Sequence, residues 1–239
     1  MDGAVTGKAP DGRQARWDAH NKARRRAIID AAIDALESHR PGEEVQLQAV
    51  AEAAGMARTV VYRHFDDRAD LDRAVQKAVF ARIGEELLPA LVPDATPREI
   101  TARVVGAFVR WAVEHPSLIW FAGRDLPGAG PSPMTTAIEN LAAGVEALME
   151  TVVGSVDADL NADDRAALDP WVFGMISGVF ASVRRWLGRD ERVPDTEVFI
   201  GILAESFYSQ VDGLAASRGI DLAAVPVTEL LQPLGGVHQ

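Results

Sequence analysis

Apolar side chains recur with the period of an α-helix along most of the chain, and this pattern limits the possible folds more than any other feature. In residues 22–38 one apolar stripe is formed by Ala27, Ile28, Ala31, Ala32 and Leu36. A spacing of three and four residues is typical of a helix that buries one face. Runs that alternate in the manner of a strand are short, and no Asn-Gly or Asp-Gly turn joins two apolar runs. The sequence therefore predicts an all-α protein.

Prolines and glycines divide the helical pattern into segments. Pro41 and Gly42 end the first predicted helix, because proline cannot continue a helix and glycine accepts the turn that follows. Further breaks fall at "LVPDATP", "GRDLPGAGPSP" and "RVPD". Long helices are predicted between these breaks, over residues 67–88, 97–114, 134–153, 164–188 and 195–217. We expect a small N-terminal helical domain followed by a larger helical one.

Two short helices are predicted between residues 45 and 64. In "VQLQAVAEAA", residues 45–54, apolar positions share one face, and Gly55 stands where a left-handed residue would end the helix. Val61 and Phe65, four residues apart, anchor a further helix predicted over residues 57–64. A helix, a turn that contains glycine and a second short helix form the outline of a helix-turn-helix motif.

The second of these short helices carries polar and cationic side chains on one arc. At about 100° per residue, Arg58, Thr59, Tyr62 and Arg63 are contiguous on a helical wheel. An isolated helix with this pattern could equally be a solvated surface helix. The preceding helix and the glycine turn favour contact with DNA, because they complete the motif.

Charge is divided unevenly along the chain. The net charge is −11, yet residues 1–80 hold 13 Lys and Arg against 13 Asp and Glu, so the excess acid lies in residues 81–239. Residues 13–26 carry six cations against the single acid Asp18. We interpret residues 1–20 as a flexible basic arm that follows the DNA backbone or enters the minor groove. A merely solubilising tail is the alternative. An acidic C-terminal domain would be repelled by DNA and would orient the molecule on it.

Several other kinds of site are not indicated. The chain contains no cysteine, which rules out disulfides, a thiolate nucleophile and a cysteine-based zinc site. Its five histidines are scattered without metal-ligand spacing, so we expect neither a metal nor a cofactor. No hydrophobic leader and no uninterrupted apolar run of about 20 residues is found, so a cytoplasmic protein without membrane contact is expected. No catalytic triad or phosphate loop indicates an enzyme.

The N-terminal segment resembles a known family. "ARRRAIIDAAIDAL" and "VQLQAVAEAAGMARTVVYRHFDDRADL", within residues 22–71, are similar to the DNA-binding domain of the TetR family of bacterial transcriptional regulators. The resemblance implies a homodimer whose third helices enter the major groove of a palindromic double-stranded operator. It also implies a pocket in each C-terminal domain that controls release from DNA. The rest of the chain resembles the family only in its helical pattern and length.

Positions matched to the phosphate backbone carry both expected and unexpected residues. Tyr62 and His64 match positions that grip phosphates, and Arg68 matches the basic residue that opens the fourth helix. Gln46 and Ala57 stand where many relatives carry Ser or Thr, whose hydroxyls cap a helix and touch a phosphate. We keep Gln46 among the DNA-binding candidates. Alanine caps a helix about 1 kcal/mol less well than serine, so the third helix is expected to depend more on packing.

Positions matched to base contacts lie on both short helices. Arg58, Thr59 and Arg63 match positions that face bases, and Gln48 matches one from which a base edge is reached. Arginine donates two hydrogen bonds to guanine, which discriminates against other bases by about 1–3 kcal/mol. Arg58 or Arg63 would therefore specify the sequence that is bound, while the phosphate contacts would fix the register.

Two long apolar helices are predicted near the C-terminus. In "PWVFGMISGVFASVRRWL" the small residues Gly174, Gly178 and Ser182 stand four apart and allow another helix to approach closely. "VFIGILAESFYSQVDGL" follows after a short break. In the resembled family such a pair forms a four-helix bundle with its twofold mate, which implies dimerisation through residues 164–188 and 195–217. A role in the core of one chain alone is the alternative.

A pocket for an apolar or amphipathic small molecule is predicted in the larger domain. Its candidate residues are Phe108, Trp111, His115, Trp120, Phe121, Trp171 and Met175. Large apolar side chains with a few polar neighbours suit such a pocket. We favour "EHPSLIWF" as a wall and residues 123–133 as an entrance. For each of these residues, ordinary core packing is the alternative.

These patterns predict a DNA-binding domain over residues 21–67 and a ligand-binding and dimerisation domain over residues 68–239. The predicted function is a transcriptional repressor released from its operator by a small molecule, although an activator would show the same pattern. An all-α enzyme or a small-molecule-binding protein without DNA binding is the alternative. The intact cations of the helix-turn-helix motif argue against it.

Overall fold

A computed structural model describes residues 12–128, 130–155 and 161–222, which are helical and contain no strand. The elements are α1 (Gly12–Glu37), α2 (Leu47–Ala53), α3 (Arg58–Val61), α4 (Arg68–Leu87), the 3-10 turn η1 (Leu88–Leu91), α5 (Pro97–Glu114), α6 (Pro116–Ala122), α7 (Pro133–Ser155), α8 (Ala162–Leu187) and α9 (Thr196–Ala216). The prediction of an all-α fold is confirmed.

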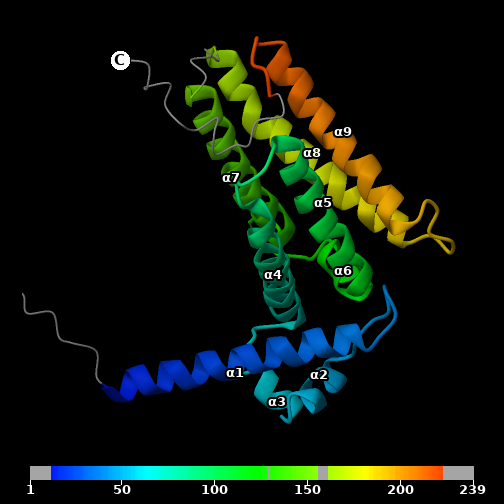
Figure 1. Cartoon of the computed structure of the whole chain (residues 1–239). Coiled ribbons are helices and arrows are strands. Elements are labelled where there is room, and N and C mark those ends of the chain that lie inside the picture. Colours follow the sequence, from blue (N-terminus) through cyan, green and yellow to red (C-terminus); the bar gives the residue numbers. More distant parts are fainter. Residues whose placement is uncertain (1–11, 129, 156–160, 223–239) are drawn as a thin grey trace, which may run out of the picture.

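The helices form two parts joined by α4 and α6. Figure 1 shows α1 lying across one end of the molecule, with α2 and α3 on its far side and α4 rising from it. Helices α5 and α9 pack together, as do α7 and α8, and α4 packs against both α5 and α7. The helix-turn-helix unit therefore lies at one end, with its outer surface turned away from the rest of the chain.

Helix α1 begins ten residues earlier than predicted. The sequence pattern placed its start at residue 22, but the helix begins at Gly12. From Arg13 to Glu37 the chain contains no proline or glycine and is rich in Ala, Arg, Gln and Lys, which have high helix propensity. Residues 12–20 of the expected arm are thus helical, which corrects that part of the prediction. Residues 1–11 lie outside the described residues.

Gly55 ends α2 as expected. Its φ is 64°, a left-handed conformation that side chains disfavour. The Gly55 N–H donates to the Glu52 carbonyl over 3.0 Å, and the Met56 N–H donates to the Ala51 carbonyl over 2.9 Å. These two bonds form a Schellman motif, which satisfies the last carbonyls of α2. The chain is then turned so that α3 starts three residues after Gly55.

Helix α3 is shorter than predicted, whereas α4 begins as expected. Regular helix covers only Arg58–Val61, and the next residues continue as tighter turns in which the His64 N–H donates to the Val61 carbonyl over 2.9 Å. Asp67 caps α4 by accepting a hydrogen bond from the Asp70 N–H over 2.8 Å. Ala57 stands at the N-cap of α3 and has no side chain that can do the same.

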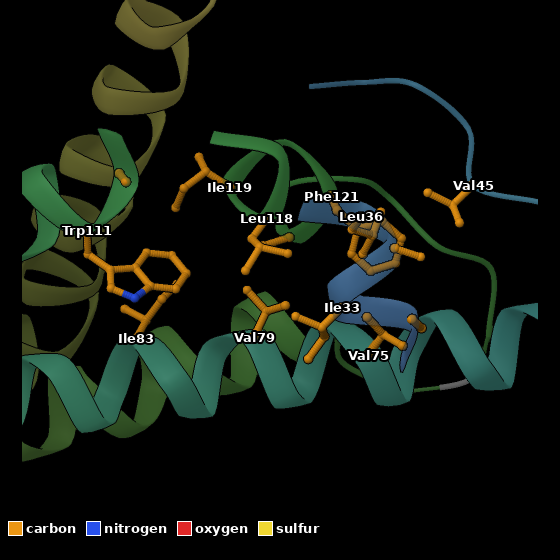
Figure 2. Packing of buried hydrophobic residues seen from close by; sticks show 14 of the residues in the cluster. Ile33, Leu36, Val45, Val75, Val79, Ile83, Trp111, Leu118, Ile119 and Phe121 are labelled. Atoms are coloured by element: carbon orange, nitrogen blue, oxygen red, sulfur yellow. The ribbon is translucent and has the colours of Figure 1, made fainter. Parts of the chain in front are cut away.

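One hydrophobic core runs through both parts of the chain. It extends from Ile28 on α1 through α4 and α6 to Ala204 on α9. Figure 2 shows Leu118 of α6 opposite Val79 of α4, and Phe121 of α6 belongs to the same cluster as Leu36 of α1. Helix α6 was not predicted as a separate helix, since Pro116 and its seven-residue length hide its periodicity. It packs on α1 and thereby joins the helix-turn-helix unit to the larger domain.

Candidate nucleic-acid interface

Two buried side chains hold α3 against the rest of the motif. Val61 is 1% exposed and Phe65 is 2% exposed, and both belong to the core that includes Val50 of α2 and Ile28 of α1. Because these residues take up the inner side of α3, its other side chains must face outward. The predicted packing role of Val61 and Phe65 is confirmed.

The outer side of α3 presents Arg58, Thr59, Tyr62 and Arg63, all exposed. We call these four residues the α3 face. Tyr62 is 45% exposed, so its ring and hydroxyl are accessible from solvent. An Arg58 Nη2 lies 3.4 Å from the Tyr62 hydroxyl, and the guanidinium is 5.7 Å from the centre of the Tyr62 ring. The two side chains thus lie together on the surface, within reach of a phosphate or a base edge.

Two glutamines stand at the start of α2, Gln46 at its N-cap and Gln48 within it. Gln48 is exposed, and its amide nitrogen donates to a Glu52 carboxylate oxygen over 2.7 Å. Gln46 is exposed at the N-cap of α2 and makes no capping hydrogen bond through its side chain. Both remain candidates for DNA contact, and Gln48 would have to leave Glu52 to reach a base.

His64 lies where three elements meet. Burial lowers its pKa below the ordinary value, and the charges of Arg24, Arg25, Arg63 and His20 lower it further. Cations of α1 and α3 therefore converge on this imidazole. A site that repels one more proton in this way attracts an anion, which fits the predicted contact of His64 with a phosphate.

Arg25 is a structural residue that the sequence did not single out. Its guanidinium lies 4.0 Å from the centre of the Phe65 ring, donates to the His64 carbonyl, and forms an ion pair of 3.3 Å with Asp70. Arg25 therefore ties α1 to the segment that joins α3 and α4. In the sequence it was one of several cations in residues 13–26, and only the fold distinguishes it from its neighbours.

The structure also gives Arg68 a role inside the protein. Its Nε donates to an Asp72 carboxylate oxygen over 2.7 Å, and its Nη2 donates to the Val45 carbonyl over 2.9 Å. Asp72 is only 8% exposed, and burial raises the pKa of its carboxyl group although Arg68 opposes this shift. These partners take up Nε and Nη2, and 32% of the side chain is exposed, so the predicted contact of Arg68 with DNA stays a prediction.

Three of the predicted ligand-binding residues lie at the junction with the helix-turn-helix unit. His115 Nδ1 is 2.5 Å from a Glu37 carboxylate oxygen at the end of α1. Trp120 lies against Gly42, which follows α1, and under the Arg184 guanidinium, 5.1 Å from the ring centre. Phe121 is 4% exposed and packs in the core.

The other predicted ligand-binding residues are divided between two clusters. Phe108 and Trp111, each 8% exposed, belong to the main core. Met175 and Trp171 belong to a smaller cluster between α7, α8 and α9, which also contains Phe207. The seven candidates are therefore not brought together around one site.

Two side chains fix the C-terminal end of α6, and sequence patterns did not reveal them. Gln76 of α4 is 1% exposed, and its amide nitrogen lies 2.9–3.3 Å from the carbonyls of Phe121, Ala122 and Arg124. Arg184 of α8 donates to the Gly123 carbonyl over 2.6 Å. A buried glutamine on an apolar helix face would have been the only signal. Within the described ranges, no group of three or more His, Cys, Asp or Glu is placed to hold a metal ion.

The fold and the α3 face define a class: all-α DNA-binding proteins with an N-terminal helix-turn-helix motif. Residues 28–75 match the family model for bacterial regulatory proteins of the tetR family. Over these residues the chain has the DNA-binding domain of this family, which is the domain of a transcriptional regulator and not of an enzyme.

The similarity to relatives and to solved structures extends over most of the chain. An uncharacterized HTH-type transcriptional regulator of Mycobacterium tuberculosis, Rv0472c, is 27% identical over 217 residues, which cover 90% of this chain and 88% of that protein. A tetR-family transcriptional regulator from Streptomyces coelicolor has a similar fold, with a TM-score of 0.63, 22% identity and coverage of 90% and 92%. RolR in complex with resorcinol gives a TM-score of 0.59 at 17% identity, with coverage of 92% and 100%.

Proposed function

We propose that this regulator is a repressor that binds a palindromic operator as a homodimer and is released by an apolar or amphipathic small molecule. The observation that carries the DNA-binding part is the α3 face, four exposed polar residues on a helix whose other side is buried through Val61 and Phe65. In this proposal Arg58 and Arg63 contact bases, while the phosphate backbone is held by Tyr62 and His64.

Dimerisation through α8 and α9 is supported by apolar surface that the chain itself leaves uncovered. Val198 and Ile202 on α9 are 51% and 52% exposed. A side chain added at Gly174, Gly178 or Gly201 would meet nothing within 4 Å, so a second helix has room to approach. Helix α8 is apolar and long enough to span a membrane, yet only 28% of its most apolar window is buried. A homodimer would cover these faces.

The smaller cluster around Trp171 and Met175 is where we place the effector. It is separate from the main core and includes partly buried Met149 and Phe207. Nearby, a carboxylate oxygen of Glu146 is buried without a hydrogen-bond partner, and burial together with Asp169 and Glu150 raises the pKa of this residue. An apolar cluster with one such polar group suits an amphipathic ligand. RolR, which has the same fold, binds resorcinol, an aromatic molecule with hydroxyl groups.

Helix α6 offers a route from this domain to DNA. Its Ser117 hydroxyl donates to the His39 carbonyl over 2.7 Å, and His115 contacts Glu37, so the start of α6 is attached to the end of α1. Its other end is held by Gln76 and Arg184 from α4 and α8. Movement of α8 on ligand binding would then shift α6, α1 and the α3 faces of the dimer.

Binding to DNA can be tested before the operator sequence is known. The full chain is used to select duplexes from a randomised library, and affinity is measured by fluorescence polarisation at several salt concentrations. Tyr62→Ala and Arg63→Ala are each expected to lower the affinity about tenfold or more, since each removes about 1–3 kcal/mol. Arg192→Ala, which changes an exposed arginine after α8, is the control. Failure to enrich any sequence would contradict the proposal.

The dimer and the effector need separate experiments. Ile202→Lys is expected to shift the molecular mass in solution from dimer to monomer, whereas Leu88→Lys, at a position 66% exposed outside the α8 and α9 faces, should not.

Resorcinol and a series of phenols and fatty acids are then tested for release of the selected duplex. At least one compound should release the wild-type chain but not Trp171→Leu. If no compound does, the proposed effector class is wrong. A reporter strain separates repression from activation: transcription that increases when the regulator is expressed would indicate an activator.

A further inference from the structure

The N-terminal half of α1 lies outside the fold. Residues 16–20 are all exposed, and from residue 16 onward Ile28 is the first residue of α1 that is fully buried. Arg25, 13 residues after the helix begins, binds the helix-turn-helix unit. At 1.5 Å per residue this segment is about 20 Å long. Figure 1 shows it projecting past α3.

One side of this projecting segment carries an aromatic side chain and two basic ones. At about 100° per residue, Trp17, His20 and Arg24 lie within an arc of about 60°, which we call the α1 face. Asp18, the only acidic residue here, lies about 100° or more from each of them. Trp17 is 61% exposed. The α1 face therefore combines an aromatic ring with Arg24 and His20 and contains no acid, whereas Lys22 lies about 160° from Arg24.

The α1 face is continuous with the α3 face. Arg24 and His20 both act on His64 at the end of α3, and each lowers its pKa, as does Arg63. Each charge that shifts the pKa of His64 is a cation. Arg24 and His20 therefore lie near His64 and Arg63, so the α1 face adjoins the α3 face.

We propose that the α1 face is a second DNA-contact site, which binds phosphates outside the base pairs that α3 reaches. This inference rests on the proposed DNA binding of α3 and extends it. An isolated helix of this length is only marginally stable in water, so a surface that binds its exposed side would stabilise it. The basic side chains of the α1 face complement the phosphate backbone. Its phosphates are spaced about 3.4 Å per nucleotide, so about 20 Å of helix covers about six of them. Arg24 and His20 contact phosphates, and the Trp17 ring packs against sugars.

The test compares arginines on opposite sides of the same helix. Arg24→Gln and Arg26→Gln remove equal charge, but Arg26 lies about 160° from Arg24 and is 86% exposed in its side chain. Affinity is measured for two duplexes centred on the selected sequence, one of about 20 base pairs that holds two half-sites, and one of about 40. Wild type should prefer the longer duplex.

Arg24→Gln should reduce this preference several-fold and lower the salt dependence of binding by about one phosphate contact, while Arg26→Gln should change neither by a comparable amount. Trp17→Ala should act on the same duplex and in the same direction. All three variants change exposed residues, and circular dichroism confirms that they fold.

Three results would overturn the inference, each in a different way. If Arg24→Gln and Arg26→Gln behave alike while Arg63→Ala abolishes binding, α3 binds DNA but the α1 face does not. If Arg24→Gln changes the molecular mass in solution and not the affinity for DNA, the α1 face contacts a second copy of the chain. If wild type shows no selective binding to either duplex, the proposed function fails first and the α1 face loses its basis.

Discussion

Two pairs of arginines in the helix-turn-helix unit carry the same charge but lie in different surroundings. Arg58 and Arg63 are exposed on α3, and no carboxylate among the described residues is hydrogen-bonded or ion-paired to them. Arg25 and Arg68 lie behind α3 and are bound to Asp70, Asp72 and backbone carbonyls. The difference teaches that charge alone does not mark a DNA contact. The internal partners of Arg25 and Arg68 give these two arginines a structural role that Arg58 and Arg63 do not share.

The largest expected effect separates packing from DNA contact on α3 itself. Phe65→Ala should lower the free energy of unfolding by about 3–5 kcal/mol, because it leaves a cavity at a residue that is 2% exposed and removes the ring under Arg25. Tyr62→Ala, three residues earlier and 45% exposed, should change it by less than about 0.5 kcal/mol. Urea unfolding measures both.

The same two variants should behave in the opposite way toward DNA. Tyr62→Ala should weaken binding while the protein remains folded. If Tyr62→Ala unfolded the domain as strongly as Phe65→Ala, the α3 face would be part of the core and not a surface for DNA.

A second comparison pairs Arg68 with Arg63. Arg68→Ala should cost about 2–3 kcal/mol of stability, because it leaves the Asp72 carboxylate buried without its partner; one third of the Arg68 side chain is exposed, which reduces the loss. Arg63→Ala should cost little stability and should weaken DNA binding. If Arg68→Ala lost affinity for DNA without losing stability, Arg68 would be a DNA contact and not a structural residue.

The loss in Arg68→Ala should depend on pH. Burial raises the pKa of Asp72, and without Arg68 it should rise further. The folded state then holds a proton that the unfolded state releases, so the unfolding free energy of the variant should fall as pH rises above about 3.9 and level off above the raised pKa. The destabilisation is therefore smaller at a pH of about 4.5 than at about 7. Asp72→Asn in the same background should remove this pH dependence.

The sequence predicts much of the difference between residues that pack inside the helix-turn-helix unit and residues on its surface. The spacing of Val61 and Phe65 and the glycine at residue 55 are local signals, and each has the structural role that its pattern predicts. The bounds of α5 were also predicted to the residue. Local signals suffice here because periodicity, turn conformation and capping depend on neighbours within about four residues.

The partners of Arg25, Arg68 and Gln76 could not be predicted in this way. Arg25 binds a carbonyl 39 residues away, and Gln76 binds carbonyls 45 or more residues away. Such contacts depend on how helices cross, which a single periodicity does not determine. For the same reason His115 and Trp120 were placed in a pocket, whereas they lie at the junction with α1.

A smaller effect is expected at His64, which lies between the exposed α3 face and the segment that Arg25 binds. Burial and, to a smaller extent, nearby cations lower its pKa in the free protein, and a bound phosphate would raise it again. DNA binding would then take up a proton, so affinity should increase as pH falls from about 7.5 to about 6, by up to about tenfold per unit of pKa difference. His64→Gln should abolish this pH dependence, whereas His39→Gln, away from α3, should retain it. An unchanged pH profile in His64→Gln would exclude the phosphate contact.

The smallest expected effect concerns the two N-caps on either side of the α3 face. Asp67 caps α4 over 2.8 Å, whereas Ala57 gives α3 no side-chain cap. Ala57→Ser should raise the unfolding free energy by about 0.5–1 kcal/mol, and Asp67→Ala should lower it by about 1 kcal/mol. The hydroxyl introduced by Ala57→Ser would also lie beside the phosphates that Tyr62 reaches, so this variant should bind DNA slightly more tightly, while Asp67→Ala should not. A stabilised Ala57→Ser with unchanged affinity would mean that the start of α3 does not approach the backbone, and that the α3 face meets DNA through its later residues.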